Sequence, residues 1–321
     1  MSLKLTFINV GYGEAMLIRC AETGFTMLVD AGSAEASEYA DNVSGRIRAH
    51  EYLESIGLER IDLMVSTHVH EDHLCGLLPV VERWMPKVFW HALPDGYAES
   101  ALRWVDPALA ENASQSKFIR ALDDYQALCR TLRDGGCKLV TVLSGHREAL
   151  CDGLDCKVLG PDEAPMAELL ERLRRACALP DGAELLKALS AVDGAMNNYS
   201  VILRLEYQGA SVLLPGDTNR AGYGGIDPAD LRADIFKVGH HGQADGASAA
   251  LIDAVQPRYA VCCASSDRRY NSAHPDLMRM LRDKGARLCF SDCPPVEGIH
   301  VPPHQALTFT IGNGDIQVEY A

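Results

Sequence analysis

Residues 67–73 read Thr67-His68-Val69-His70-Glu71-Asp72-His73. Four potential metal ligands, three imidazoles and a carboxylate, therefore lie within six residues in the spacing His-x-His-x-Asp-His. The motif follows the short apolar run 61–66, which is typical of a buried strand. Neutral imidazole and carboxylate suit zinc, with iron or manganese as alternatives. We therefore predict a metal centre at the exit of this strand, and a merely solvated or helix-capping loop is the less favoured interpretation.

One loop cannot complete the coordination of two ions, so the motif needs ligands from elsewhere in the chain. Alternate side chains leaving a strand end project to one side, so His68 and His70 can converge on one ion while Asp72 and His73 reach a second. Three later positions offer further ligands: Asp217 after the apolar strand 211–215, His240 and His241 after the strand 234–238, and His274 before the helix 275–284. Each signal is weak alone, and their shared position at strand and helix ends gives them weight together.

Hydrophobic periodicity predicts a chain in which strands and helices alternate. We expect strands at 3–10, 15–20, 26–30, 61–66, 200–207, 211–215, 234–238, 259–264, 286–290, 306–311 and 315–320. We expect helices at 44–56, 114–133, 161–178, 183–192, 247–255 and 275–284. Antiparallel strands at both ends, interleaved with helices, predict an α/β fold with two sheets sandwiched between helices. We assign residues 1–321 to one domain, with a helix-rich insertion at about 97–190.

Composition restricts the class of protein. The 321 residues carry 30 Lys and Arg against 44 Asp and Glu, a net charge of −14, with 47% apolar and 23% charged residues. This is a globular composition, and its acidity argues against a general nucleic-acid or anionic-membrane binder without excluding a local basic groove. Eleven scattered cysteines without a C-x-x-C pair indicate reduced thiols. With neither a signal peptide nor a long apolar run in view, we expect a soluble, cytoplasmic protein that makes no membrane contact.

The chain resembles the metallo-β-lactamase superfamily, and within it the branch of the soluble domain of the DNA-uptake protein ComEC and of the choline-phosphate esterases. The matching segments are 8–15, 27–32, 68–73, 197–200, 215–217, 237–242 and 274–275. The His-x-His-x-Asp-His motif carries the likeness to the superfamily. The stretches Val10-Gly11-Tyr12-Gly13 and His240-His241-Gly242 narrow the resemblance to the branch of ComEC and the choline-phosphate esterases.

The resemblance implies a four-layer αββα sandwich with a two-metal site on one edge of its β core. The ligands it implies are His68, His70, Asp72, His73, Asp217, His241 and His274. Asp217 would bridge the ions, His274 would share a shell with Asp72 and His73, and His241 would join His68 and His70. Asp30 would be the buried carboxylate that orients the metal loop. His240 and His241 cannot be ranked securely from the sequence, so His240 is kept as a pocket residue.

Two positions depart from the pattern that the resemblance implies. Many superfamily members have a histidine about 20 residues before the bridging aspartate, and this chain has Asn197 there. An amide oxygen is a poorer ligand than imidazole, so the first metal must recruit another group or bind more weakly. Gln243 stands where the branch usually has serine, which puts the branch's substrate preference in doubt.

The expected function is a metal-dependent hydrolase of an ester-type bond, with a phosphodiester favoured by the resemblance. Two divalent ions, with Zn2+ favoured over Mn2+ or Fe2+, would lower the pKa of a shared water and create a hydroxide nucleophile. Asp72 or Asp217 would relay a proton to the leaving group, and His240 would stabilise developing charge. The alternatives are a lactone, thioester or amide hydrolase on the same site, and a metal-binding regulatory module without turnover. The net charge favours a small-molecule substrate over nucleic acid, and the 97–190 stretch is expected to form a lid or wall over the pocket.

Overall fold

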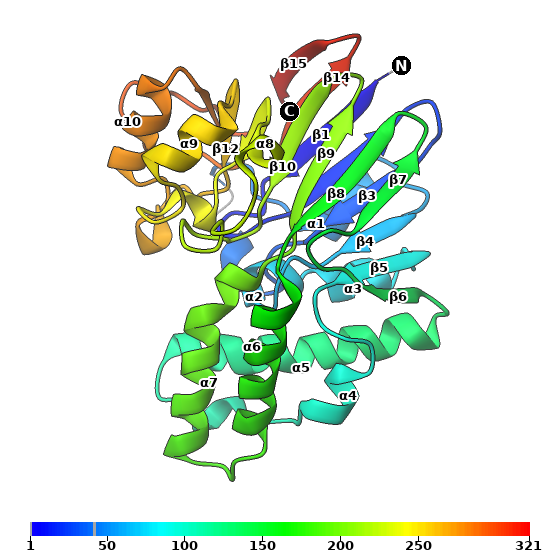
Figure 1. Cartoon of the computed structure of the whole chain (residues 1–321), viewed down its shortest axis with the longest axis vertical. Helices are drawn as coiled ribbons and strands as arrows, with labels where there is room; N and C mark the ends of the chain where they lie inside the picture. The colour runs from blue at the N-terminus through cyan, green and yellow to red at the C-terminus, as the bar shows by residue number, and fades with distance from the viewer. Residues whose placement is uncertain (1, 41–42) are drawn as a thin grey trace.

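The computed structural model describes residues 2–40 and 43–321, and its strands form two sheets packed face to face (Figure 1). The first sheet has the order β15-β14-β1-β2-β3-β4-β5-β6. Its strands are β1 (Leu3–Ile8), β2 (Met16–Cys20), β3 (Thr26–Val29), β4 (Leu63–Val65), β5 (Val88–His91), β6 (Lys138–Thr141), β14 (Ala306–Gly312) and β15 (Asp315–Tyr320). Neighbours from β15 to β3 run antiparallel, and those from β3 to β6 run parallel.

The second sheet has the order β13-β12-β11-β10-β9-β8-β7. Its strands are β7 (Arg147–Cys151), β8 (Leu154–Gly160), β9 (Ile202–Tyr207), β10 (Ala210–Leu214), β11 (Ile235–Lys237), β12 (Tyr259–Cys262) and β13 (Arg287–Phe290). Strands β10 to β13 are parallel to one another. Gln208-Gly209 and Asn313-Gly314 make the two expected hairpin turns, with positive φ at both residues of each pair.

Helices cover the outer faces of both sheets. They are α1 (Ala49–Ser55), α2 (Glu71–Leu74), α3 (Leu77–Val81), α4 (Tyr97–Ala101), α5 (Ala113–Asp134), α6 (Glu163–Cys177), α7 (Ala183–Met196), α8 (Pro228–Leu231), α9 (Ala249–Val255) and α10 (Pro275–Asp283). Helices α9 and α10 pack on the second sheet, while α1, α3 and α5 share the core of the first. The predicted arrangement of two sheets between helices is therefore confirmed. No helix in the described ranges is both long and apolar enough to cross a bilayer.

Strand β11 shows why the central strands read as unbroken apolar runs. Ile235 faces the core between the sheets, and Phe236 faces the core beneath α9 and α10. Both side chains are fully buried, because each face of the strand is covered. The charged side chain of Lys237 follows them and is also fully buried, so this strand ends on a charge that is shielded from solvent.

The expectation of a helix-rich insertion at about 97–190 overlooked three strands, β6 to β8, and β5 just before that stretch was not expected either. Helices α5, α6 and α7 lie where they were expected, but β6 belongs to the first sheet and β7 and β8 belong to the second. Strand β7 is an edge strand with an exposed start, so it lacks an apolar pattern that would identify it. The helix expected at 44–56 begins only at Ala49. The single-domain assignment and the lid at 97–190 stay predictions.

Close backbone packing joins the β1–β2 loop to the metal motif. The amide of Glu14 donates to the carbonyl of Asp72 at 3.1 Å. Gly13 has a φ of 133°, and a Cβ built on it would lie 2.2 Å from the same Asp72 oxygen. Only glycine fits at this position, because any side chain would push the loop away from the motif.

Lys237 ties the two sheets together through buried charges. Its ammonium contacts the carboxylate of Glu14, donates to the Gly216 carbonyl at 2.6 Å and lies 3.3 Å from Asp217 Oδ1. Lys237 and Glu14 have no exposed side-chain surface. Burying either charge alone would be costly, so the Lys237 ammonium and the Glu14 carboxylate stabilise each other.

Substitution Gly13→Ala tests the close approach. We expect a loss of about 2–5 kcal/mol in the free energy of unfolding, because the new Cβ meets backbone oxygen and the φ value is unfavourable. Gly57→Ala is the matched control: Gly57 also has a positive φ, of 64°, but open space around it. It should cost only about 1–2 kcal/mol in urea denaturation. Equal losses in the two variants would contradict the steric argument.

Substitution Lys237→Met tests the buried ion pair. Leaving Glu14 and Asp217 without their cation should destabilise the metal-free protein by about 3–5 kcal/mol in urea denaturation. The double variant Lys237→Met/Glu14→Gln removes the orphaned charge of Glu14 and should recover part of that loss. A double variant no more stable than the single one would show that the two groups are not energetically coupled.

Candidate metal centre

Asp30 holds both ends of the His-x-His-x-Asp-His motif. The amide of Thr67 donates to its Oδ1 at 2.8 Å, and the Thr67 hydroxyl donates to its Oδ2 at 2.6 Å. His73 Nδ1 donates to the same Oδ2 at 2.8 Å. Asp30 is fully buried and has a left-handed backbone, with a φ of 53°. This is the geometry that the orienting role expected of Asp30 requires.

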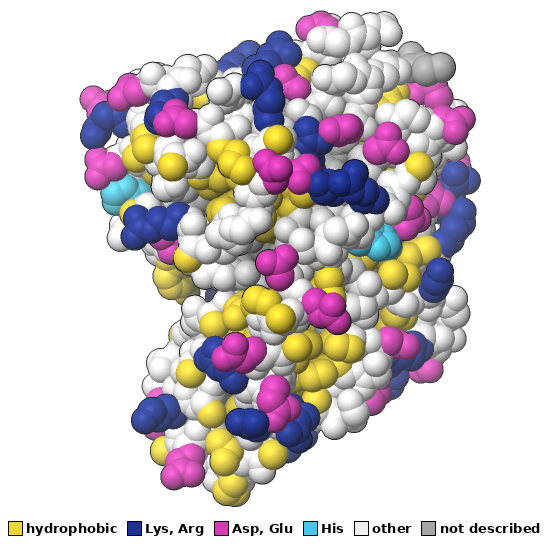
Figure 2. All heavy atoms as spheres, viewed as in Figure 1, with side chains coloured by type: hydrophobic (Ala, Val, Ile, Leu, Met, Phe, Trp, Pro, Cys, Tyr) yellow, Lys and Arg dark blue, Asp and Glu magenta, His cyan; other side chains and the backbone are white. Residues whose placement is uncertain are grey.

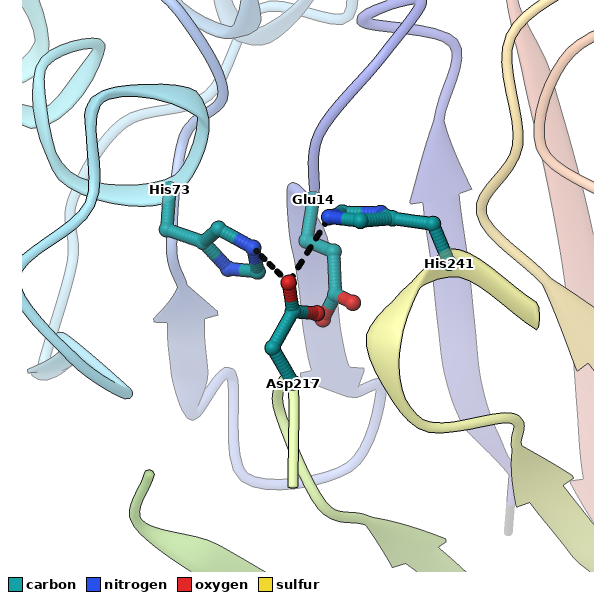
Figure 3. A group of neighbouring side chains, drawn as sticks. All are labelled: Glu14, His73, Asp217 and His241. Atoms are coloured by element: carbon teal, nitrogen blue, oxygen red, sulfur yellow. Dashed lines mark ion pairs between the residues drawn. The ribbon is translucent and has the colours of Figure 1, made fainter. Parts of the chain in front are cut away.

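Side chains from four distant segments meet at one edge of the sandwich (Figure 3). His241 Nε2 lies 2.8 Å from Asp217 Oδ2 and 3.1 Å from Asp72 Oδ2. His73 Nε2 lies 3.3 Å from the same Asp217 oxygen. With Glu14, the ligand atoms of His73, Asp217 and His241 all lie within 4.8 Å of one another. Asp217 Oδ2 is thus the common neighbour of both imidazoles, while its Oδ1 faces Lys237.

The protonation of these two imidazoles shows that the cluster fits a cation. His73 Nδ1 donates to Asp30, and His241 Nδ1 donates to the Cys263 carbonyl at 2.9 Å. The Nε2 atom of each ring is therefore the one turned toward Asp217, and it has no hydrogen-bond partner among the described residues. An imidazole nitrogen this close to a carboxylate oxygen requires positive charge between the two atoms, from a proton on the ring or from a bound cation. The donor set, imidazole plus carboxylate, is one that divalent metal ions prefer.

The charges of the metal-free cluster are strongly coupled. Burial would lower the pKa of His73, but Asp217 and Asp72 outweigh burial and raise it well above its usual value. The pKa of His241 is raised in the same way by Asp217. Burial would raise the pKa of Asp217, yet His241 and His73 hold it well below its usual range. Positive charge is therefore favoured here, whether it comes from protons or from metal ions.

His68 and His70 form a second pair of donors beside this cluster. His68 Nε2 lies 3.0 Å from His70 Nδ1. The Thr67 hydroxyl gives its proton to Asp30, so the 3.0 Å contact between Thr67 and His68 requires that His68 Nδ1 donates. Burial and the neighbouring His73 and His70 lower the pKa of His68 well below its usual value. His68 is therefore neutral with Nε2 unprotonated, the state that a metal ligand needs.

The structure separates the two adjacent histidines that the sequence could not rank. His241 is fully buried in the cluster, whereas His240 faces the pocket. His240 Nδ1 lies 2.9 Å from Asp245 Oδ1, and its Nε2 lies 3.1 Å from the Asn197 amide nitrogen and 3.0 Å from that of Gln243. Both histidines have left-handed backbone, with φ of 49° and 51°. With this backbone conformation, the two consecutive imidazoles point in different directions, His241 into the cluster and His240 into the pocket.

His274 does not join the cluster. It caps the N-terminal end of α10, where its Nδ1 accepts a hydrogen bond from the Asp276 amide at 3.3 Å. Its backbone amide donates to Gly242. The expectation that His274 shares a shell with Asp72 and His73 therefore finds no support in this geometry, because its ring nitrogen serves the helix instead.

Three residues in this region received no role from the sequence. Glu14 and Lys237 lie inside motifs that match the superfamily, but only the fold shows that they form a buried ion pair. Asp193 lies inside α7, and its Oδ1 is 3.0 Å from His70 Nε2. An acidic residue in a helix carries no sequence signal that distinguishes it from an ordinary surface residue.

A pocket of about 320 Å³ opens over the cluster. Its wall combines residues of the motif, of α5 and α7 and of other connecting segments: Tyr12, His70, Glu71, Asp72, Ser114, Lys117, Phe118, Asp193, Gly194, Asn197, Asp217, His240, Gln243 and Tyr270. On the face shown in Figure 2, the outline is indented between the part that carries α8 to α10 and the part that carries α4 to α7. Positive and negative side chains are interspersed over that face.

Known proteins are similar to parts of this chain and to its fold. ComE operon protein 3 of Bacillus subtilis (strain 168) is 21% identical over 299 residues, which cover 90% of this chain and 32% of that protein. Competence protein ComA of Neisseria gonorrhoeae is 28% identical over 130 residues, covering 38% of this chain and 17% of that protein. The chain thus spans a third or less of the length of these curated relatives. The crystal structure of CmlA, a diiron beta-hydroxylase from Streptomyces venezuelae, aligns with a TM-score of 0.49 at 15% identity, covering 96% of this chain and 54% of that one.

A family model also matches the part of the chain that contains the metal motif. The model described as "Metallo-beta-lactamase superfamily" matches residues 8–152, which include Asp30 and the 67–73 motif. The two large sheets flanked by helices agree with the sandwich of that superfamily. The sequence match covers slightly less than half of the chain, and both it and the fold are similar to the metallo-β-lactamase superfamily.

Proposed function

We propose that this protein is a metal-dependent hydrolase that cleaves an ester-type bond, with a phosphodiester as the favoured substrate class. The observation that carries the proposal is the pair of unpartnered Nε2 atoms of His73 and His241, both turned toward Asp217 Oδ2 beneath an open pocket. Paired imidazoles and a shared carboxylate hold divalent cations in hydrolytic sites.

The residues that would hold the ions form two groups. His73, Asp72, Asp217 and His241 surround one position, and His68 and His70 face a second. When bound, two divalent ions supply Lewis acidity toward the substrate and lower the pKa of water at the site. Zn2+ is the favoured ion, with Mn2+ and Fe2+ as alternatives. Because Lys237 occupies Asp217 Oδ1, the other oxygen of that carboxylate is the one free to serve an ion.

The chain's own residues orient the substrate and move protons. The Asp245 carboxylate accepts a hydrogen bond from His240 Nδ1, so His240 Nε2 is presented to the pocket between Asn197 and Gln243. In this arrangement the Asn197 and Gln243 amides donate to His240 Nε2, so His240 would donate to the leaving group or to developing negative charge once Nε2 is protonated and these amides have turned away. Asp72 and Asp217, which lie deeper, are the proposed acceptors of the nucleophile's proton.

The pocket and the relatives guide the choice of substrate. The similarity to ComE operon protein 3 supports the ComEC-like branch and, with it, a phosphodiester. A pocket of about 320 Å³ and a net charge of −14 support a small molecule rather than a long polyanion. Lys117 and the rings of Tyr12, Phe118 and Tyr270 line the pocket and would contact such a substrate. Eleven free cysteines support a reducing, cytoplasmic location.

Metal content and turnover test this proposal together. The purified protein, reconstituted with zinc or manganese, should hydrolyse a phosphodiester reporter faster than lactone, thioester or amide reporters. Asp217→Asn should lower turnover by about 100-fold or more, because it removes the charge shared by both imidazoles. Asp253→Asn is the matched control, since that aspartate pairs with Lys284 on the exposed surface of α9 and should leave turnover unchanged.

Three outcomes would overturn parts of the proposal. Metal content well below one ion per chain, with no turnover of any reporter after reconstitution, would exclude the hydrolase. Turnover of carboxyl-acyl reporters alone would replace the phosphodiester with a lactone, thioester or amide. Stoichiometric metal without turnover would favour the regulatory module, for which the unusual Asn197 is the supporting feature.

A further inference from the structure

Three aromatic rings form a path from the metal cluster to the solvent-exposed part of the pocket. The Tyr12 ring lies 4.3 Å from the His241 ring, measured between ring centroids, and the Tyr270 ring packs edge-on against Tyr12 at 5.2 Å. Exposure rises along this path: His241 is fully buried, Tyr12 is 7% exposed and Tyr270 is 56% exposed. Tyr12 and Tyr270 both line the pocket. The outermost residue of the path therefore keeps more than half of its surface open to solvent beside the metal centre.

The backbone that carries Tyr270 has an unfavourable conformation. Tyr270 has a φ of 54°, and Arg268, Asn271 and Ala273 in the same loop, 265–273, have φ values of 49°, 58° and 47°. Residues with a Cβ rarely adopt this left-handed conformation. A loop with four such residues persists only where the surrounding structure fixes it.

A buried network of charges fixes this loop against Tyr12. Arg269 contacts the Glu38 carboxylate and places its guanidinium 5.8 Å from the centre of the Tyr12 ring. Glu38 Oε1 accepts a hydrogen bond from the Tyr12 amide at 2.9 Å and lies 3.2 Å from Arg46 Nη1. Arg46 and Glu38 are both buried, so the network belongs to the core. The core therefore sets the positions of both tyrosines, although neither has a part in the proposed chemistry.

The charges beside the rings favour a planar ring over a cationic group as their ligand. A tyrosine face attracts cations as well as flat π-systems. Here the Arg269 guanidinium already lies over Tyr12, and Lys117 lines the same pocket. A cationic ligand on Tyr270 would meet both positive side chains, whereas a neutral planar ring would not.

We propose that Tyr270 is a specificity-determining residue whose ring stacks against a planar aromatic ring of the substrate, such as a nucleobase. This inference rests on the proposed function, because it places the bond to be cleaved over the metal cluster and the planar ring at the outer end of the path. Stacking needs a flat π-face in the ligand and adds affinity without taking part in the chemical step. It also explains why an exposed ring is carried by a strained loop that buried charges hold in place.

Binding to the zinc-loaded protein tests the inference without turnover. AMP and ribose 5-phosphate share a sugar phosphate and differ in the purine ring, so calorimetric titration with each isolates the contribution of the ring. Wild-type protein should bind AMP about 5- to 100-fold more tightly, Tyr270→Phe should keep this preference and Tyr270→Ala should lose it. Trp104→Ala is the matched control, because that ring is 64% exposed and lies outside the pocket lining. Thermal melting shows whether the variants fold equally well.

Steady-state kinetics separate recognition from catalysis. With thymidine 5′-(p-nitrophenyl phosphate) as substrate, Tyr270→Ala should raise KM by about 5- to 100-fold and leave kcat within about two-fold, since a stacking contact is equally strong in the bound substrate and in the transition state. A loss confined to kcat would instead place Tyr270 in the chemical step and contradict the proposal.

The failures of the inference and of the proposed function are distinguishable. Equal affinities for AMP and ribose 5-phosphate in wild-type protein, or a preference that survives in Tyr270→Ala, would overturn the inference. Tighter binding of phosphocholine than of AMP would assign the ring to a cationic group and overturn it as well. Zinc-loaded protein that prefers AMP through Tyr270 but hydrolyses no reporter would count against the proposed function alone.

Discussion

The contact between the Lys237 ammonium and Asp217 is the interaction on which the rest of this centre depends. Asp217 presents one carboxylate oxygen to Lys237 and the other to His73 and His241. Without the lysine, Asp217 and Glu14 would be buried anions without a fixed cation, a costly arrangement. Burial lowers the pKa of Lys237 to about 8, and its ammonium contacts the carboxylates of both Glu14 and Asp217. The contact between Lys237 and Asp217 therefore orients the Asp217 carboxylate. The contact between Lys237 and Glu14 joins the second sheet to the β1–β2 loop of the first.

The histidines of the centre follow one rule: one ring nitrogen is held from outside the cluster and the other faces inward. Asp30 holds His73, the Cys263 carbonyl holds His241, and Thr67 holds His68. Fixing the outer nitrogen sets the tautomer and leaves the inner one free to bind a cation. His70 has the same arrangement, because its Nδ1 faces His68 and its Nε2 lies 3.0 Å from Asp193 Oδ1 of α7.

The helices between β5 and β9 do more than cover the site. Helix α5 contributes Ser114, Lys117 and Phe118 to the pocket, and α7 contributes Asp193 and reaches Asn197 at its end. The strands within the same stretch belong to both sheets, so the helices are anchored on each side to the core. A pocket wall anchored in this way can position a ligand as firmly as a strand end can.

Local residue patterns were enough to predict the motif at 67–73, the two-sheet fold and the strand exits at Asp217 and His241, because ligand spacing and apolar runs are local properties. The polar edge strand β7 could not be recognised, since it gains its conformation from its partner β8. At His274 the sequence did not reveal the helix cap, because a histidine before Pro275 looks the same whether it binds a metal or caps a helix. Only the tertiary structure decided that Lys237 pairs with Glu14 and that Asp193 meets His70, because these contacts join residues 223 and 123 positions apart. Such contacts depend on how sheets and helices pack, and a linear pattern does not contain that information.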